Sequence, residues 1–447
     1  MKKSLLRAGV AVVLGCAVIG SMTACGSGDG DNTVTFYHYS MTSKLNAQLE
    51  EKIADFTEQT GIKVKHVPVS KDNYNATIST KIGGRKKDID ILYLDQPLLA
   101  QYASSGLLYN LDGYITDGSG ETETVSDGDG FKFDRNAFND SAWQTTVYNG
   151  SCYAVPLTMN TSVFYYNTAT VKAALGLNTD AEAVAAVETV KTWDDLKAFA
   201  GRVSGLGTDY ALFGGMSSGG YMGWYSQCFV AAAGGTMYDP ATKTVFPDEE
   251  ATESAFEMIK YLYDNSPKEI YNSSTGFKGT TSSPAGKVLF NLADSSAIKD
   301  LNVSYTTFGA IPVPGKTADI GSKSNIGGEN LVIANKSEKK DSALEFMKYL
   351  VSEDCADMFQ ACTNNFSAID KYAKVETFSG DPASSVYKMY GVIKDSLENA
   401  QVRPVVSGWI QVNDNGIPSG LNKYIEGEST FEKALSDIRA FAGQYLK

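Results

Sequence analysis

Between Val34 and Asp95 the chain alternates short β-rich runs with helix-like segments, and this pattern restricts the fold to a parallel sheet covered by helices. Val34–Tyr39, Ile62–Val69 and Ile91–Leu94 have the composition and alternation of strands. Helix-like segments lie between them. In the first segment, the apolar residues Leu45, Leu49, Ile53 and Phe56 mark one helical face, and in the second, Tyr74–Ile82 suits a short helix. A βαβαβ unit of this kind places ligands beyond the carboxyl ends of its strands.

A second mixed region begins near Ala154, so the whole chain is predicted to be α/β. Strands are predicted at Val163–Tyr166 and Leu331–Ala334. Helices are predicted after a threonine N-cap at Thr192, around the face formed by Phe256, Ile259 and Tyr263, and at Ala343–Leu350. A terminal helix is predicted from the apolar stripe between Phe431 and Tyr445. Of the 447 residues, about 420 follow the N-terminal leader, enough for two domains.

The N-terminal segment has the features of an export signal. Met1–Ala24 begins with basic residues and continues with a short apolar stretch and small residues. Met22-Thr23-Ala24-Cys25 resembles the bacterial lipobox, in which the cysteine is acylated and becomes the new N-terminus. Cys25 is therefore predicted to carry a lipid anchor, with residues 25–32 as a flexible tether; an ordinary cleavage site with an incidental cysteine is the alternative.

Charge and cysteine content argue against several partners. The net charge is -13, and without the three basic residues of the leader it becomes -16, so nucleic acid is not expected as a partner. The cysteines at 152, 228, 355 and 362 are few and widely spaced, which predicts buried thiols. The polar segment 117–130 is predicted to be an exposed loop, and its Asp127–Gly130 lacks the further ligands of a calcium loop. We predict no metal and no cofactor.

Several segments carry a family resemblance through their order and spacing. They are Asp90–Asp95 followed by Gly106 to Leu111, Ala154–Pro156 followed by Val163–Asn167, Thr192–Leu196, Gly309–Pro314, Gly327–Ile333 and Ser342–Leu350. Together, over Val34–Lys447, they resemble the extracellular solute-binding proteins of bacterial carbohydrate importers, the group that includes maltose-binding protein. The resemblance implies a type II periplasmic-binding-protein fold, with two discontinuous α/β lobes joined by a hinge and a ligand in the cleft between them.

The resemblance also implies domain boundaries and a function. The N-terminal lobe is predicted to comprise 33–157 and 312–350, and the C-terminal lobe 158–311 and 351–447. The chain is predicted to capture an extracellular carbohydrate, with an oligosaccharide as the expected ligand, and to deliver it to the permease subunits of an ABC importer. It is expected to be a monomer, held on the outer face of the cytoplasmic membrane through Cys25, and not an enzyme.

A sugar site needs directed hydrogen bonds for the hydroxyl groups and flat rings for the apolar faces. The ends of the first and third strands supply candidates of both kinds, namely Tyr37, His38, Tyr39, Ser40, Asp95 and Gln96. Asp95 would either accept sugar hydroxyls or cap the following helix.

Further candidates come from later segments. Trp224 and Tyr225 follow a glycine-rich stretch, and Arg403 and Trp409 lie in a segment similar to the family's R-P-x-x-x-x-[WY] motif. Asp294 and Ser295 follow a segment similar to G-K-x-A-M, with Leu289 and Phe290 as departures from it. The remaining candidates are Asn160, Gly328, Glu329 and Asn330. Each tryptophan would either stack on a sugar or fill the core, and Arg403 would bind hydroxyl groups or form an internal ion pair; Trp143 and Trp193 are expected to be structural.

Two other classes of function compete with this interpretation. Gly215–Gly219 fits the G-x-S-x-G nucleophile elbow, but His38 and His66 both precede Ser217, whereas that fold places its histidine after the serine. A glycoside hydrolase with paired carboxylates, or a surface adhesin or sensor with the same fold, stays open as an alternative. The sequence does not specify the sugar.

Overall fold

The computed structural model describes residues 33–446 except 41, 85–86, 128–129, 215, 217–219, 269–286 and 302–307. The predicted signal peptide, Cys25, the tether and most of the G-x-S-x-G segment lie outside the described residues. Within the described part of the chain, no helix combines the length and the hydropathy that a membrane span requires.

The predicted βαβαβ unit is confirmed. It consists of β1 (Thr33–Ser40), α1 (Ser43–Thr60), β2 (Lys63–Ser70), α2 (Lys71–Ile82) and β3 (Ile91–Asp95). β1 lies between β2 and β3 and is parallel to both. The Thr42 side chain caps α1, and Gly61 ends it in the left-handed conformation, which glycine adopts without a steric cost. The apolar face of α1 is buried as its spacing predicted.

Two antiparallel strands extend this parallel unit into a mixed sheet. β16 (Ser324–Ile333) pairs with β3 on one side and with β9 (Val155–Thr161) on the other. The full order is β17-β9-β16-β3-β1-β2, with β18 (Ala400–Gln401) pairing with β16. β9 and β16 are buried along their whole lengths, which explains their continuous run of uncharged residues apart from Glu329.

A second sheet has the order β11-β14-β10-β15. Its strands are β11 (Ala211–Gly214), β14 (Val288–Ala293), β10 (Val163–Asn167) and β15 (Phe308–Ile311). Only Ser162 separates β9 of the first sheet from β10 of the second, so the chain passes from one sheet to the other in a single extended step. The alternation of β10 sends Phe164 and Tyr166 to a different hydrophobic cluster from Val163 and Tyr165.

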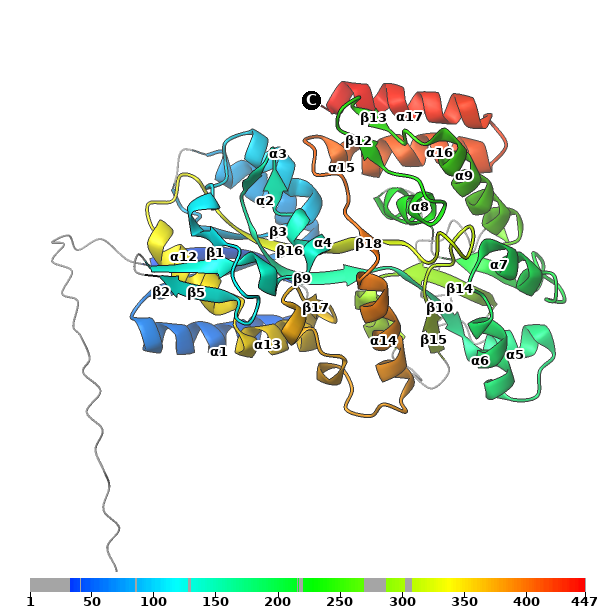
Figure 1. Ribbon diagram of the computed structural model, residues 1–447, viewed down its shortest axis with the longest axis horizontal. Helices are drawn as coiled ribbons and strands as arrows, with labels where there is room; N and C mark the ends of the chain where they lie inside the picture. The colour runs from blue at the N-terminus through cyan, green and yellow to red at the C-terminus, as the bar shows by residue number, and fades with distance from the viewer. Residues whose placement is uncertain are drawn as a thin grey trace, which may run out of the picture. The chain divides into compact units, whose positions relative to one another are not determined.

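Helices cover both sheets and complete two lobes, each with its own hydrophobic cluster. We call the elements around the first sheet the first lobe and those around the second sheet the second lobe. In Figure 1, α1 and α13 run beside each other in the first lobe, and α16 and α17 do so in the second. The helices not yet given are α3 (Leu99–Ser104), α4 (Asp140–Gln144), α5 (Thr168–Leu175), α6 (Asp180–Glu188), α7 (Trp193–Ala200), α8 (Gly220–Ala232), α9 (Glu249–Asp264), α12 (Lys340–Leu350), α13 (Glu353–Thr363), α14 (Ser385–Leu397), α15 (Trp409–Gln411), α16 (Ile417–Ile425) and α17 (Phe431–Tyr445).

The packing differs from the predicted lobe boundaries in three places. β9 stays in the first sheet to Thr161, beyond the predicted change at 158. The backbone of Gly315 and Lys316 bonds to the second lobe, beyond the predicted change at 312. α13 packs on α1, and β17 (Phe366–Ser367) pairs with β9, so the chain directly after 351 remains with the first lobe. α14 contacts both β9 of the first sheet and β15 of the second, and the buried residues join the second cluster from Trp409 onward. Helical periodicity predicts a buried face but not the sheet that it covers.

The segment 117–130, predicted to be a loop without regular structure, instead contributes to a small sheet. β4 (Ile115–Thr116), β5 (Thr124–Asp127) and β6 (Gly130–Asp134) form it in the order β4-β6-β5. The Asp134 carboxylate holds the segment by accepting hydrogen bonds from the amides of Gly118 and Gly120 at 2.8 and 2.7 Å. Among the described residues, no group of three or more His, Cys, Asp or Glu side chains is placed to hold a metal ion.

The predictions for the cysteines and two tryptophans are confirmed. Cys152, Cys228, Cys355 and Cys362 are unbridged and buried. Trp143 and Trp193 are buried core residues, and the Trp193 indole donates to the Pro314 carbonyl at 2.9 Å.

Candidate functional site

Side chains from both lobes converge on a cavity of about 100 Å³. It lies at the carboxyl ends of β1, β2 and β3, where the two antiparallel strands β9 and β16 pass toward the second lobe. Its lining residues are Tyr39, Lys71, Tyr74, Asn75, Asp95, Asn160, Trp224, Asp294, Ser296, Gly328, Glu329 and Asn365. The wall therefore combines aromatic rings, amides and carboxylates, which are the groups that a sugar requires.

Glu329 forms the buried polar centre of the first-lobe wall. The Tyr39 hydroxyl donates to one of its carboxylate oxygens and the Thr158 hydroxyl to the other. Burial raises the pKa of Glu329 above its usual value, although the bonds from Thr158 and Tyr39 act in the opposite direction. With both oxygens engaged, Glu329 mainly fixes the Tyr39 ring, which also packs edge-on against Tyr74 with centroids 5.2 Å apart.

Trp224 forms the second-lobe wall and is held in place by Arg403. The guanidinium carbon of Arg403 lies 4.4 Å from the Trp224 ring centroid, within cation–π range. Its Nη2 also lies 3.4 Å from Oδ1 of Asp95, so Arg403 links a ring of the second lobe to a carboxylate of the first. The structure thus shows the internal ion pair for Arg403. It shows no capping bond from Asp95 to the following 3-10 helix, and 43% of the Asp95 side chain remains exposed.

Two glycines of β16 permit this close arrangement. A Cβ atom on Gly327 would lie 2.4 Å from the Trp224 ring and 2.2 Å from Oδ1 of Asn160. Gly328 has φ +134°, and a Cβ there would lie 2.1 Å from the Thr158 carbonyl oxygen. Both positions therefore require glycine, the first for close approach and the second also for its backbone conformation.

Two polar atoms on the wall have no hydrogen-bond partner within the described protein. They are Oδ1 of the buried Asn160, whose amide nitrogen donates to Asn365 at 3.1 Å, and the indole nitrogen of Trp224. A buried polar atom without a partner costs about 1–3 kcal/mol. Asn160 and Trp224 both line the cavity, so a ligand that reaches these two atoms would satisfy one acceptor and one donor.

Seven predicted residues line this cavity: Tyr39, Asp95, Asn160, Trp224, Asp294, Gly328 and Glu329. Arg403 contacts two of them without lining it. Ser40 ends β1, but its side chain lies outside the described residues.

The other predicted residues do not reach the cavity. His38 is fully buried and faces the opposite side of β1, where its ring nitrogen lies 3.0 Å from that of His66. Trp409 is 1% exposed and packs near Tyr238 in the second cluster, so it fills the core. Tyr37, Gln96, Tyr225, Ser295 and Asn330 are also buried away from it, with Ser295 donating to Asn365 at 2.9 Å and Asn330 bonding to Thr145.

Sequence reasoning missed the contribution of β2 and α2. Lys71, Tyr74 and Asn75 line the cavity because β2 is parallel to β1 and ends at the same edge of the sheet. The strand-end rule, applied to β2 as it was to β1 and β3, would have found Lys71. Ser296 and Asn365 were also missed, and Asn365 follows a helix whose position over β9 the sequence does not reveal.

Lys71 carries the ammonium group of the wall. Its Nζ lies 5.9 Å from the Tyr39 ring centroid. Burial alone would lower the pKa of Lys71, but Tyr221 and the carboxyl groups of Glu329, Asp294 and Asp95 raise it above its usual value. Tyr221, one turn before Trp224 on α8, is 55% exposed and stacks on Tyr225 with ring centroids 6.0 Å apart.

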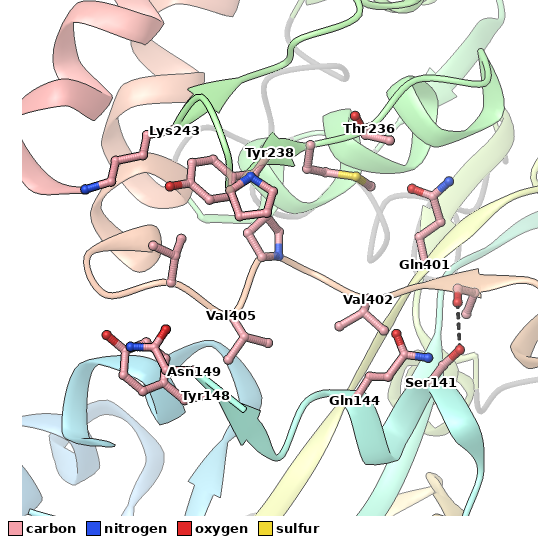
Figure 2. Close-up of a pocket in the computed structure, with 15 residues that line it drawn as sticks. Ser141, Gln144, Tyr148, Asn149, Thr236, Tyr238, Lys243, Gln401, Val402 and Val405 are labelled. Atoms are coloured by element: carbon pink, nitrogen blue, oxygen red, sulfur yellow. Dashed lines mark hydrogen bonds between the residues drawn. The ribbon is translucent and has the colours of Figure 1, made fainter. Parts of the chain in front are cut away.

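A larger cavity, about 830 Å³ in volume, lies along residues 400–406 (Figure 2). Gln144 and Tyr148 of the first lobe and Tyr238 of the second contribute to its walls (Figure 2). It contains no predicted site residue and no carboxylate, and Lys243 is its one charged lining residue among those described. We therefore place the candidate site at the smaller cavity, where charged groups, amides and rings meet at the strand ends.

A family model described as bacterial extracellular solute-binding protein matches residues 51–385. The chain belongs to this family. Its fold is similar to that of the GacH receptor of Streptomyces glaucescens, solved unliganded and with acarbose (21% identity, TM-score 0.69, covering 92% of this chain and 99% of that one). It is also similar to the sugar-binding protein MalE from Xanthomonas citri (16% identity, TM-score 0.73, 92% and 98%) and to the cyclic α-maltosyl-1,6-maltose binding protein from Arthrobacter globiformis (18% identity, TM-score 0.72, 92% and 98%).

These likenesses confirm the predicted two-lobed α/β fold and the predicted family. The members of this family are binding proteins, and the site of this solute-binding protein contains the elements of a non-covalent ligand cavity.

Proposed function

We propose that this solute-binding protein captures an extracellular carbohydrate, expected to be an oligosaccharide, in the cavity between its lobes and releases it to an ABC importer. The observation that carries this proposal is the meeting of Trp224 from one lobe with Asp95 and Asn160 from the other around one cavity. A sugar placed there would stack on the indole and donate hydroxyl protons to the carboxylate and the amide oxygen. The GacH receptor, solved with acarbose, and the cyclic α-maltosyl-1,6-maltose binding protein have a similar fold and support the same assignment.

The cavity itself is smaller than a whole sugar ring requires, since ligand pockets generally span about 300–1,000 Å³. We infer that it seats one hydroxyl-bearing edge of the sugar and that the rest of the ligand extends past Tyr221. Movement of the lobes about β9, β16 and residues 400–408 would adjust the cavity to the ligand. A ligand shifts that equilibrium only by binding one arrangement better than the other.

Transport further requires a position at the membrane and a docking partner. We propose that Cys25 carries the lipid anchor, that residues 25–32 form the tether, and that the monomeric protein works on the outer face of the cytoplasmic membrane with permease subunits. It would bind its ligand unmodified, without catalysis. Mass spectrometry of the membrane-extracted protein tests the anchor: acyl groups on an N-terminal Cys25 support it, and an unmodified mature protein contradicts it.

Titration calorimetry against neutral mono- and oligosaccharides tests the binding function. A sugar that binds should give Trp224→Ala an affinity lower by about 1–3 kcal/mol, because the variant loses a stacking surface. Trp409→Phe is the matched control, since Trp409 lies in the core, and it should keep the wild-type affinity.

Two outcomes would contradict the proposal. Equal affinity of wild type and Trp224→Ala would place the ligand elsewhere. Cleavage products after incubation with oligosaccharides would indicate a glycoside hydrolase instead.

A further inference from the structure

Carboxyl groups outnumber cationic groups around the candidate site. Asp95, Asp294 and Glu329 line the cavity, whereas Lys71 is the one cationic side chain among the lining residues that the structure describes. Asp414 and Arg403 stand behind the wall, and Asp414 lies within electrostatic range of both Asp95 and Arg403. The cavity therefore has an excess of negative charge in a chain whose net charge is already -13.

The cationic groups near the cavity are largely engaged with protein groups. Arg403 is almost fully buried, stacks on Trp224 and donates a hydrogen bond to Asp95, so its positive charge is already paired with a carboxylate of the protein. Lys71 is surrounded electrostatically by Asp95, Asp294 and Glu329 and lies over the Tyr39 ring. Neither group forms the bidentate arrangement with two free donors that recognises a carboxylate or phosphate.

The groups that remain available are mostly acceptors. Asp95 is partly exposed, and the Asp294 carboxylate uses Oδ1 to cap the following turn at Ser296. Asn160 lines the cavity, and its buried Oδ1 has no partner from the described protein, which independently favours a ligand that donates a hydrogen bond there. The donors opposite these three acceptors are the indole N–H of Trp224 and the ammonium group of Lys71. Such a wall suits a ligand with many hydroxyl donors and no negative charge of its own.

We propose that the cavity selects saccharides without acidic groups and excludes uronic, sulfated and phosphorylated sugars. The inference rests on the proposed carbohydrate function and specifies its ligand class. An anionic group placed against Asp95 and Asp294 meets like charges, and juxtaposed like charges at an interface are strongly unfavourable. We therefore expect a sugar acid to bind at least about tenfold more weakly than its neutral parent.

Calorimetry on matched pairs tests the selection. Each neutral saccharide that binds is compared with the derivative in which one primary hydroxyl is oxidised to a carboxylate, in low and in high salt. The neutral member should bind more tightly for every position of oxidation, and the difference should shrink in high salt because screening weakens the repulsion. Asp294→Asn, whose amide oxygen retains the cap, should lower the discrimination, whereas Lys71→Met should raise it. Asp395→Asn, an exposed change on α14 away from the cavity, controls for net charge and should leave the discrimination as in the wild type.

The outcomes separate this inference from the function on which it rests. The charge selection is overturned if a sugar acid binds as tightly as its neutral parent, or if binding of the sugar acid is lost in Lys71→Met alone. In either case the carbohydrate function stands. If no saccharide of either kind binds, the carbohydrate function itself fails, and the inference fails with it.

Discussion

The two histidines of the chain touch each other inside the first lobe, and this contact predicts an acid-sensitive fold. Nδ1 of His38 lies 3.0 Å from Nε2 of His66, and Nδ1 of His66 lies 2.6 Å from a carboxylate oxygen of Glu50. His38 is fully buried against Phe36 and Tyr93, whereas Glu50 lies at the surface. Burial, with a smaller contribution from the neighbouring His66, lowers the pKa of His38 from 6.5 to about 3.

The sign and size of the effect follow from linkage. Between pH 6.5 and about 3 the unfolded chain binds a proton at His38 that the folded chain does not, so stability falls as the pH decreases through this window. One unit of pKa difference corresponds to about 1.4 kcal/mol, so the loss attributable to His38 at pH 5 is about 2 kcal/mol relative to pH 8. Above pH 7.5 this contribution is constant.

Urea unfolding at pH 8 and pH 5 of wild type and His38→Asn measures this contribution. The asparagine keeps a polar atom near His66 but takes up no proton, so its stability should fall less than that of the wild type over the same interval, by about 2 kcal/mol. Because the chain has two histidines, NMR of the imidazole C–H groups gives two pairs of signals, and the pair missing from His38→Asn should not titrate above pH 4. Equal losses in both proteins, or a His38 signal that titrates near pH 6.5, would refute the reasoning.

Two further predictions concern the arrangement of the site. Gly327→Ala places a methyl group 2.4 Å from the Trp224 ring, so the ring must move, and sugar affinity should fall by about 1–3 kcal/mol in calorimetry, while Gly391→Ala, with open space around its Cβ position, should bind as the wild type does. Arg403→Lys keeps the charge but loses the planar stacking on Trp224, so affinity should fall by about 1 kcal/mol; unchanged affinity would show that the guanidinium does not position the ring.

Local patterns explain which parts of the fold the sequence predicts well. The βαβαβ unit follows from apolar spacing and from helix ends such as Gly61, signals that lie within a few residues of the elements they define. The N-cap at Thr192 is likewise local and forms as predicted, with the Asp195 carboxylate accepting from the Thr192 amide at 2.9 Å. The lobe to which α13 belongs has no such local signal, because it depends on contacts with α1 and β9 far along the chain.

The same distinction applies within the candidate site. Strand ends predicted Tyr39 and Asp95, and the position before a predicted strand indicated Glu329. The predictions took neighbouring residues together, although successive side chains of a strand face opposite ways. Alternation along β1 separates His38 from Tyr37 and Tyr39, and alternation along β16 separates Asn330 from Glu329. The two-residue period of a strand, applied to β1 and β16, therefore places His38 and Asn330 on the faces opposite to Tyr39 and Glu329, whereas only the structure shows which face borders the cavity.

The role of Arg403 is the part that no local pattern contains. It lies 308 residues from Asp95 in the chain and contacts Trp224, a residue of the other lobe, from a segment that itself connects the lobes. Its neighbours Val402 and Pro404 line the larger cavity, while Arg403 itself contacts Asp95 and Trp224 of the smaller one. Any movement of the lobes must therefore change the geometry of Asp95, Arg403 and Trp224 together. Under the proposed function, a ligand that contacts Asp95 and Trp224 at once would act directly on the connection between the lobes, and this contact would link binding to hinge motion without a separate relay.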